Sequence, residues 1–223
     1  MNNFSRIFFT AVMALGFTTQ ASAQKVLNEG SIVYDITVQT GSKEPQMADA
    51  LDGAKTTIYV TNTQSRADFV NALGSESTIH DAKAGNAVIL KEYSGQKLMI
   101  TLTKEDWATK NKKYDNIVFT ILPEEKTIAG YKCKKATATV DGNTFAVYYN
   151  TEISIANKAY DNTFKNLPGL AMEYEYQVGK LKLNFTASKI SFEPVLAAKF
   201  DFPKSGYRVM TYAENQQLKK GNR

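Results

Sequence analysis

The sequence predicts a mainly β protein built on one curved antiparallel sheet, an open half-barrel with two or three short helices on its concave side. Three observations support this fold class. Apolar and polar residues alternate with a period of two over most of the chain, as in half-buried strands. Short turn signals separate these stretches. Their second face is polar, which is typical of an antiparallel sheet with one solvated side.

Residues 1–23 are predicted to be a cleaved signal peptide. Arg6 provides a positive start, residues 7–17 form a short apolar core, and Ala21 and Ala23 give the small-x-small pattern of a cleavage site. An apolar run of this length is too short to cross a bilayer as a helix. We therefore expect an exported protein, periplasmic or secreted, without a transmembrane segment, in which residues 24–223 form a single β-rich domain.

The first half of the chain is expected to hold five strands, over residues 30–40, 55–62, 65–70, 87–93 and 97–103. One short helix is expected over residues 44–54, ending at a glycine. A second helix should begin after Thr103, whose side chain can cap the first turn, and run to about Asn111 with Trp107 on it. The polar tail over residues 213–223 should fray or end in a short helix.

Asp141 and Gly142 predict a tight β-hairpin, because Asp-Gly readily adopts the two positive-φ positions of a type I′ turn. A two-residue loop there pairs Val140 with Asn143, Ala138 with Phe145, and Ala136 with Val147. Small side chains then lie opposite large ones. The apolar face changes sides near Lys134 and Lys135, which predicts a β-bulge.

A second hairpin is expected with its turn at Val178 and Gly179. It would pair Tyr176 with Leu181, Tyr174 with Leu183, Met172 with Phe185, and Glu175 with Lys182. The concave face of a curled sheet would then collect eight apolar side chains: Met172, Tyr174, Tyr176, Leu181, Leu183, Phe185, Phe145 and Val147. This face is either ordinary core or a pocket in which tyrosines and a flexible methionine adapt to an apolar ligand.

The sequence offers little for catalysis or metal binding. His80 and Cys133 are its only histidine and cysteine, too few for a structural zinc site. We expect His80 to be an exposed histidine in a loop or at a strand end, in preference to a base oriented by Asp81. We expect Cys133 to be a small buried hydrophobe, in preference to a reactive thiol. No catalytic residue, metal site or cofactor is therefore predicted.

Three segments, "TIAGYKCKKATA" (127–138), "FAVYYNTEIS" (145–154) and "NLPGLAMEYEY" (166–176), resemble secreted GLPGLI-type proteins of Gram-negative bacteria and a related domain family of unknown function. Ala171 departs from the naming motif, which continues with isoleucine. The resemblance implies a fold like the periplasmic lipoprotein carriers of the LolA/LolB type, an open half-barrel with helices on its concave face. It also implies a carrier or binding domain for a hydrophobic ligand, and it supplies no catalytic residues.

These observations predict a non-enzymatic exported protein that binds a lipid or acyl chain on the concave face. The alternative is a structural or protein-interaction domain of the cell envelope with a dry core and an envelope protein as its partner. A third class, a hydrolase, would require His80 in a cleft. A nucleic-acid partner is not expected, because the net charge of +5 comes from scattered lysines without a binding motif.

Overall fold

The computed structural model describes residues 24–39, 50–178 and 181–221. The predicted signal peptide lies outside these ranges, as does most of the predicted helix over residues 44–54. Within them the chain forms a 12-stranded sheet in the order β14-β7-β6-β5-β4-β3-β2-β13-β12-β10-β9-β8 and a 2-stranded sheet of β1 and β11.

The strands of the large sheet are β2 Gly30–Gln39, β3 Lys55–Val60, β4 Gln64–Asn71, β5 Gly74–Asp81, β6 Ala87–Tyr93, β7 Gln96–Leu102, β8 Thr120–Ile128, β9 Tyr131–Val140, β10 Asn143–Asn150, β12 Leu170–Val178, β13 Leu181–Ser191 and β14 Arg208–Thr211. The small sheet pairs β1 Lys25–Leu27 with β11 Ile153–Ile155 in parallel. The helices are α2 Lys104–Asn111 and α3 Tyr212–Gly221, with short 3-10 turns at Lys112–Tyr114, Lys158–Tyr160 and Ala197–Phe200.

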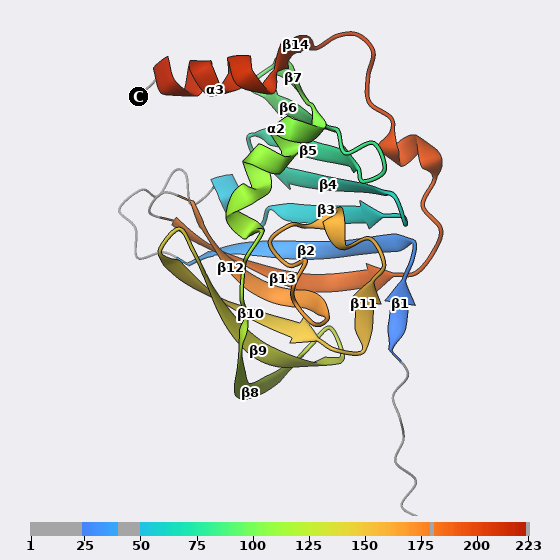
Figure 1. The fold of residues 1–223 in the computed structure, drawn as a ribbon, viewed down its shortest axis with the longest axis vertical. Coiled ribbons are helices and arrows are strands. Elements are labelled where there is room, and N and C mark those ends of the chain that lie inside the picture. Colours follow the sequence, from blue (N-terminus) through green and yellow to red (C-terminus); the bar gives the residue numbers. More distant parts are fainter. Residues whose placement is uncertain (1–23, 40–49, 179–180, 222–223) are drawn as a thin grey trace, which may run out of the picture.

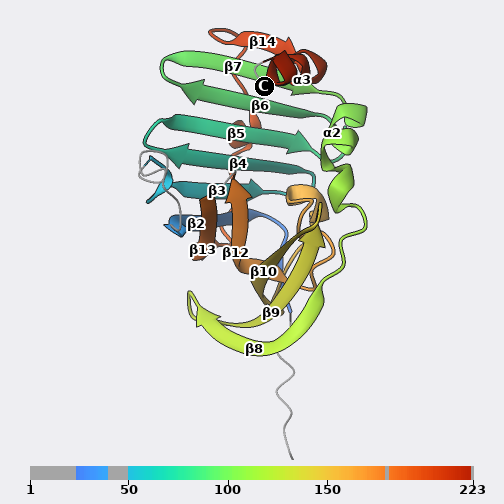
Figure 2. The same cartoon turned by 90° about the vertical axis from the view of Figure 1, so that its left-hand side faces the viewer.

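The large sheet is open and strongly curved, which confirms the predicted half-barrel. Strands β3 to β7 form one flat wing, and β8, β9 and β10 curl away from it at the other end (Figure 2). β8 and β14 are the two outer strands, and they do not pair with each other. The pairing is antiparallel throughout except at β14, which lies parallel to β7.

Helix α2 lies along the strand ends at one side of the β3–β7 wing (Figure 2), and α3 follows β14 at the edge (Figure 1). The predicted start of α2 is confirmed. The Thr103 hydroxyl accepts a hydrogen bond from the backbone N–H of Asp106 (3.2 Å), and the Asp106 carboxylate accepts one from the N–H of Thr103 (3.0 Å). This capping box satisfies two N–H groups that the first helical turn would leave unpaired. The predicted short helix at the C-terminal tail is confirmed as α3.

The β9–β10 hairpin has the predicted register, with Val140 opposite Asn143 and Ala136 opposite Val147. Asp141 and Gly142 have φ values of 50° and 78°, as a type I′ turn requires. β9 pairs with β10 without interruption, so the predicted β-bulge is not in that ladder. The irregularity lies instead in β8, whose register shifts between Ile121 and Glu125, opposite this part of β9.

The predicted register of the β12–β13 hairpin is wrong by two residues. Tyr176 pairs with Leu183, Tyr174 with Phe185, and Val178 with Leu181. A shift of two residues keeps every side chain on its predicted face, which is why alternation alone did not exclude it.

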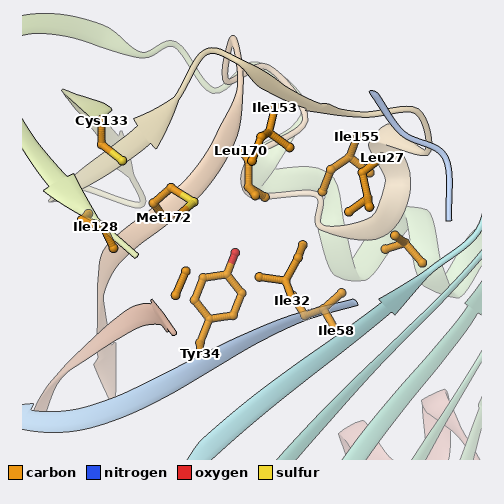
Figure 3. Close-up of a cluster of buried hydrophobic side chains, with 12 residues drawn as sticks. Leu27, Ile32, Tyr34, Ile58, Ile128, Cys133, Ile153, Ile155, Leu170 and Met172 are labelled. Atoms are coloured by element: carbon orange, nitrogen blue, oxygen red, sulfur yellow. The ribbon is translucent and has the colours of Figure 1, made fainter. Parts of the chain in front are cut away.

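The largest buried cluster joins the β1–β11 pair to the curved part of the sheet. Figure 3 shows Tyr34 projecting from β2 toward Met172 and Leu170 of β12, beside Ile153 and Ile155 of β11. All of these side chains are at most 3% exposed. The Tyr34 hydroxyl donates a hydrogen bond to the carbonyl of Ala171 (2.7 Å). The small sheet therefore fills one end of the half-barrel with buried apolar side chains. The other end of the half-barrel is not covered by this sheet.

Candidate ligand-binding site

A pocket of about 470 Å³ opens on the curved part of the sheet, beside the turn of the β9–β10 hairpin. Its volume lies within the range of roughly 300–1,000 Å³ that is usual for small-molecule sites. β10, β12 and β13 supply one wall, and the irregular segment after residue 160 supplies another. The lining residues are Lys113, Tyr114, Val140, Asp141, Gly142, Asn143, Thr144, Phe145, Asp161, Thr163, Phe164, Tyr174, Glu175, Tyr176, Gln177, Lys182 and Phe185.

Aromatic rings form the apolar part of this pocket. Tyr174 stacks on Phe185 with ring centroids 4.8 Å apart, and it also contacts Phe164 at 4.7 Å and Tyr34 at 5.5 Å. Phe145 meets Phe164 edge to face at 6.5 Å, and Tyr176 meets Phe185 in the same way at 6.5 Å. Offset and edge-to-face pairs of this kind hold each ring in a defined orientation. The pocket therefore has a preformed wall of aromatic side chains.

Charged groups lie around the aromatic rings, and most of them are paired. Lys182 forms an ion pair with Glu175 (2.7 Å), and Lys113 lies 3.8 Å from Asp141. The Asp161 carboxylate accepts a hydrogen bond from the backbone N–H of Thr163 (2.8 Å). Burial raises the pKa of Asp161 because the surrounding protein disfavours its charged form, although the Thr163 hydrogen bonds oppose this shift.

The pocket brings together four of the eight residues that the sequence predicted as ligand-lining. Phe145, Tyr174, Tyr176 and Phe185 all contribute to its wall. Their contact with a ligand stays a prediction.

The other four predicted lining residues are packed in the interior. Met172 lies in the cluster of Figure 3, Val147 packs with Phe164 and Leu167, and Leu183 packs with Ile36. Leu181 is also buried. The β1–β11 pair covers Met172, and the segment between β11 and β12 covers Val147. Leu183 is covered elsewhere, beside Leu51 and Ala54, just before β3. Period-two alternation cannot show which part of a face a distant segment will cover.

Sequence analysis did not identify Asp161, Thr163 and Phe164 as candidates. They lie in an irregular stretch between the 3-10 turn Lys158–Tyr160 and β12, where neither the period of a strand nor that of a helix is present. The only local signal is the Asp-x-Thr spacing of an Asx-type turn, which the Thr163 N–H contact confirms.

The predicted exposure of His80 is wrong. His80 lies next to the last residue of β5, close to one of the two predicted positions, but it is only 4% exposed. Its ring stacks on Trp107 of α2, with centroids 4.4 Å apart. Burial lowers the pKa of His80, and the nearby Asp81 only partly opposes this. His80 does not line the aromatic pocket.

Cys133 is fully buried in the same cluster as Tyr34, as expected for a small hydrophobe. Burial raises the pKa of its thiol to about 11, so the thiolate that a nucleophile needs is disfavoured. Across the described ranges, no group of three or more His, Cys, Asp or Glu side chains converges in a way that could hold a metal ion. No helix in the same ranges is long and apolar enough to cross a membrane.

Fold and site together define an open, curved β-sheet domain with an aromatic pocket on the sheet. The chain belongs to the family described as N-glycanase peptide, N-terminal domain, whose family model matches residues 50–193. This is not the GLPGLI-type family of the sequence analysis, and that resemblance stays a prediction. A search of curated proteins finds no match.

Among solved structures, the chain is similar to PNGF-II in space group P21, with 12% identity and a TM-score of 0.51. That match covers 86% of this chain and 33% of PNGF-II, so the chain spans about a third of that protein. Weaker similarities are to MucB (9% identity, TM-score 0.43, 79% and 58% covered) and to LprF from Mycobacterium bovis (11% identity, TM-score 0.34, 76% and 89% covered). At 12% identity, the PNGF-II match supports the fold alone.

Proposed function

We propose that this protein is a non-enzymatic exported domain that binds a hydrophobic ligand in the aromatic pocket. The observation that carries the proposal is the preformed wall of Phe145, Phe164, Tyr174 and Phe185 around about 470 Å³ of space. Largely apolar walls with a few placed polar groups are typical of ligand pockets. Export is supported by the signal-peptide pattern of residues 1–23 and by the resemblance of residues 127–176 to secreted proteins.

Binding is proposed in preference to catalysis because the two chemically reactive side chains are used structurally. His80 is stacked beneath Trp107, and Cys133 is buried in the core. The family description names an N-glycanase, and PNGF-II is about three times the length that this chain matches. An activity of the longer protein therefore need not reside in the part that this chain resembles.

The first test is a titration of the mature chain with N-phenyl-1-naphthylamine, a neutral apolar probe whose fluorescence rises in apolar sites. We expect saturable binding that Phe145→Ala with Tyr176→Ala weakens by roughly tenfold, as for truncated anchors in other interfaces. Leu196→Ala is the matched control, because Leu196 is 77% exposed and lies outside the pocket. Binding that is equal in all three proteins would reject the pocket assignment. Native mass spectrometry of gently purified protein would then identify any natural adduct.

A second candidate function is a protein-interaction domain of the cell envelope. It is favoured by β8, a nine-residue outer strand, on which Ile121 is 56% exposed close to the 77% exposed Val118. Outer strands offer free backbone groups to which a partner can add a strand. Pro123 and the charged residues that follow it reduce this tendency. If an envelope protein co-purifies with the native chain and is lost with Ile121→Lys, this second function is favoured.

A further inference from the structure

A second, smaller pocket of about 260 Å³ adjoins the aromatic pocket. It lies between the β5–β7 strands, the end of α2 and helix α3. The two pockets share Lys113, Tyr114 and Tyr176, so they lie on either side of the same three residues. The charged residues that line the second pocket are Glu76, Lys91, Lys110, Lys113 and Lys219.

The second pocket carries an excess of positive charge. Its one carboxylate, Glu76, is paired with Lys91 at 2.5 Å. Within the described ranges, neither Lys110 nor Lys219 has a carboxylate within ion-pair distance, and Lys113 reaches only the exposed Asp141 at 3.8 Å. Three lysines from α2, the turn after it and α3 therefore line one small space without a close carboxylate partner for each.

Desolvation by the surrounding protein lowers the pKa of Lys110. The carboxylates of Glu76 and Asp161 oppose this shift, and the positive charges of Lys113 and Lys219 add to it by smaller amounts. An anion bound among the three lysines would offset their mutual repulsion and replace the lost hydration.

The aromatic pocket has a different charge balance. Its Lys182 is already paired with Glu175, and the shared Lys113 faces Asp141, another residue of this pocket, at 3.8 Å. Its Asp161 carries no lysine partner within ion-pair distance in the described part of the chain. An anionic group would therefore find no uncompensated lysine in the aromatic pocket, whereas an uncharged hydrocarbon chain fits the rings. The aromatic pocket therefore suits the hydrocarbon chain of a ligand, and the second pocket suits an anionic group at the end of that chain.

We propose that the ligand is a single-chain amphiphile with an anionic head group. The hydrocarbon chain lies along Phe145, Tyr174 and Phe185, and it passes Tyr176 at the junction. The head group lies in the second pocket, bound by Lys110, Lys113 and Lys219. This inference rests on the proposed function, because it specifies the chemical class of the same pocket's ligand.

The test compares three probes with the same sixteen-carbon chain, below their micelle concentrations: hexadecanoate, hexadecanol and hexadecyltrimethylammonium. Isothermal titration calorimetry on the mature chain measures each dissociation constant. We expect hexadecanoate to bind about tenfold more tightly than hexadecanol, because charge-assisted hydrogen bonds are roughly twice as strong as neutral ones. The cationic probe should bind most weakly. The advantage of hexadecanoate should decrease with salt, as for any exposed charge pair.

The matched variants remove two positive charges at different places. Lys110→Gln with Lys219→Gln should abolish the preference for hexadecanoate and leave the affinity for hexadecanol unchanged. The control, Lys134→Gln with Lys189→Gln, removes the same two positive charges from exposed positions outside both pockets. It should keep the preference for hexadecanoate over hexadecanol. These substitutions are at the surface, and circular dichroism checks that each variant is folded.

The outcomes separate this inference from the proposed function. If hexadecanol and hexadecanoate bind equally, or if the Lys134/Lys189 control loses the preference as well, the anionic-head inference is overturned while the apolar pocket stands. If none of the three probes binds, the proposed function itself fails. A preference for hexadecyl phosphate over hexadecanoate would retain the inference and identify a phosphate head.

Discussion

The ring of His80, at the end of β5, stacks on the ring of Trp107 in α2, with centroids 4.4 Å apart and planes inclined by 17°. This contact attaches the helix to the sheet beside the apolar cluster of Ala87, Ile100 and Leu102. Nδ1 of His80 is buried and has no hydrogen-bond partner within the described ranges. A proton on Nδ1 would therefore place a charge in a buried position, where the Asp81 carboxylate compensates it only in part.

The first prediction is a loss of stability in acid that depends on His80. Burial lowers the folded-state pKa below the ordinary value of 6.5, so the unfolded chain takes up the proton first as the pH falls. Above about pH 6.5, His80 should not affect the free energy of unfolding. As the pH falls from 6.5 to the pKa of His80 in the folded protein, the free energy of unfolding should decrease. Urea denaturation at pH 8 and pH 5 should show a larger decrease for the natural chain than for His80→Gln.

The same contact provides a direct readout, because Trp107 is the only tryptophan. Its fluorescence should titrate with a midpoint below 6.5 in the folded protein, and His80→Gln should remove that transition. A midpoint at or above 6.5 would contradict the depressed pKa and the burial that causes it.

The second prediction concerns the hydrogen bond from Tyr34 to the carbonyl of Ala171. Both groups are buried, so Tyr34→Phe leaves the carbonyl without its partner while keeping the ring in place. We expect the free energy of unfolding to decrease by about 1–3 kcal/mol. Tyr176→Phe is the control, because Tyr176 is 48% exposed and water can replace any partner of its hydroxyl. Equal effects of the two substitutions in urea titrations would show that the buried bond contributes little.

The two hairpins show which parts of the fold a single sequence specifies. Asp141 and Gly142 determine the first hairpin locally, since few other dipeptides adopt a type I′ turn so readily. In the second hairpin, a shift of two residues leaves the faces unchanged. The expected attraction between Glu175 and Lys182 also survives that shift, because the pair forms diagonally at 2.7 Å. The alternation of apolar and polar residues was therefore equally consistent with the predicted register and with the register that the structure shows.

The site could be predicted only in part for a related reason. Alternation correctly indicated the apolar face that contains Tyr174 and Phe185. It could not indicate that Leu27 and Ile153, more than 120 residues apart, would come together over Met172. The burial of His80 likewise depends on α2, whose position over the sheet is a tertiary contact that no local pattern records.

The third prediction concerns Asn150, a fully buried amide that makes three hydrogen bonds. Its Nδ2 donates to the carbonyl of Lys132 (2.8 Å), and its Oδ1 accepts from the N–H groups of Glu152 (3.0 Å) and Ile153 (2.9 Å). Asn150→Ala removes all three and should cost about 3 kcal/mol of unfolding free energy. Thermal unfolding should show no comparable change for Asn116→Ala, because Asn116 is exposed.

The fourth prediction concerns Gly169, in the Leu-Pro-Gly-Leu corner before β12. The sequence suggested that this glycine permits a turn. The structure gives a different reason: a Cβ at residue 169 would lie 2.1 Å from the carbonyl oxygen of Asn150 and 2.8 Å from its carbon. Those atoms belong to the backbone that the Asn150 side chain holds in place, so they cannot move aside cheaply.

Gly169→Ala should therefore destabilise the fold by about 1–3 kcal/mol, the usual cost of overpacking a rigid site. Gly221→Ala is the matched control, because a Cβ at that position meets no atom within 4 Å. The urea midpoint should fall for Gly169→Ala and stay unchanged for Gly221→Ala. If Gly169→Ala is as stable as the natural chain, the backbone contact with Asn150 is not tight. The corner would then depend on the fixed φ of Pro168 and the buried Leu167 and Leu170 on either side.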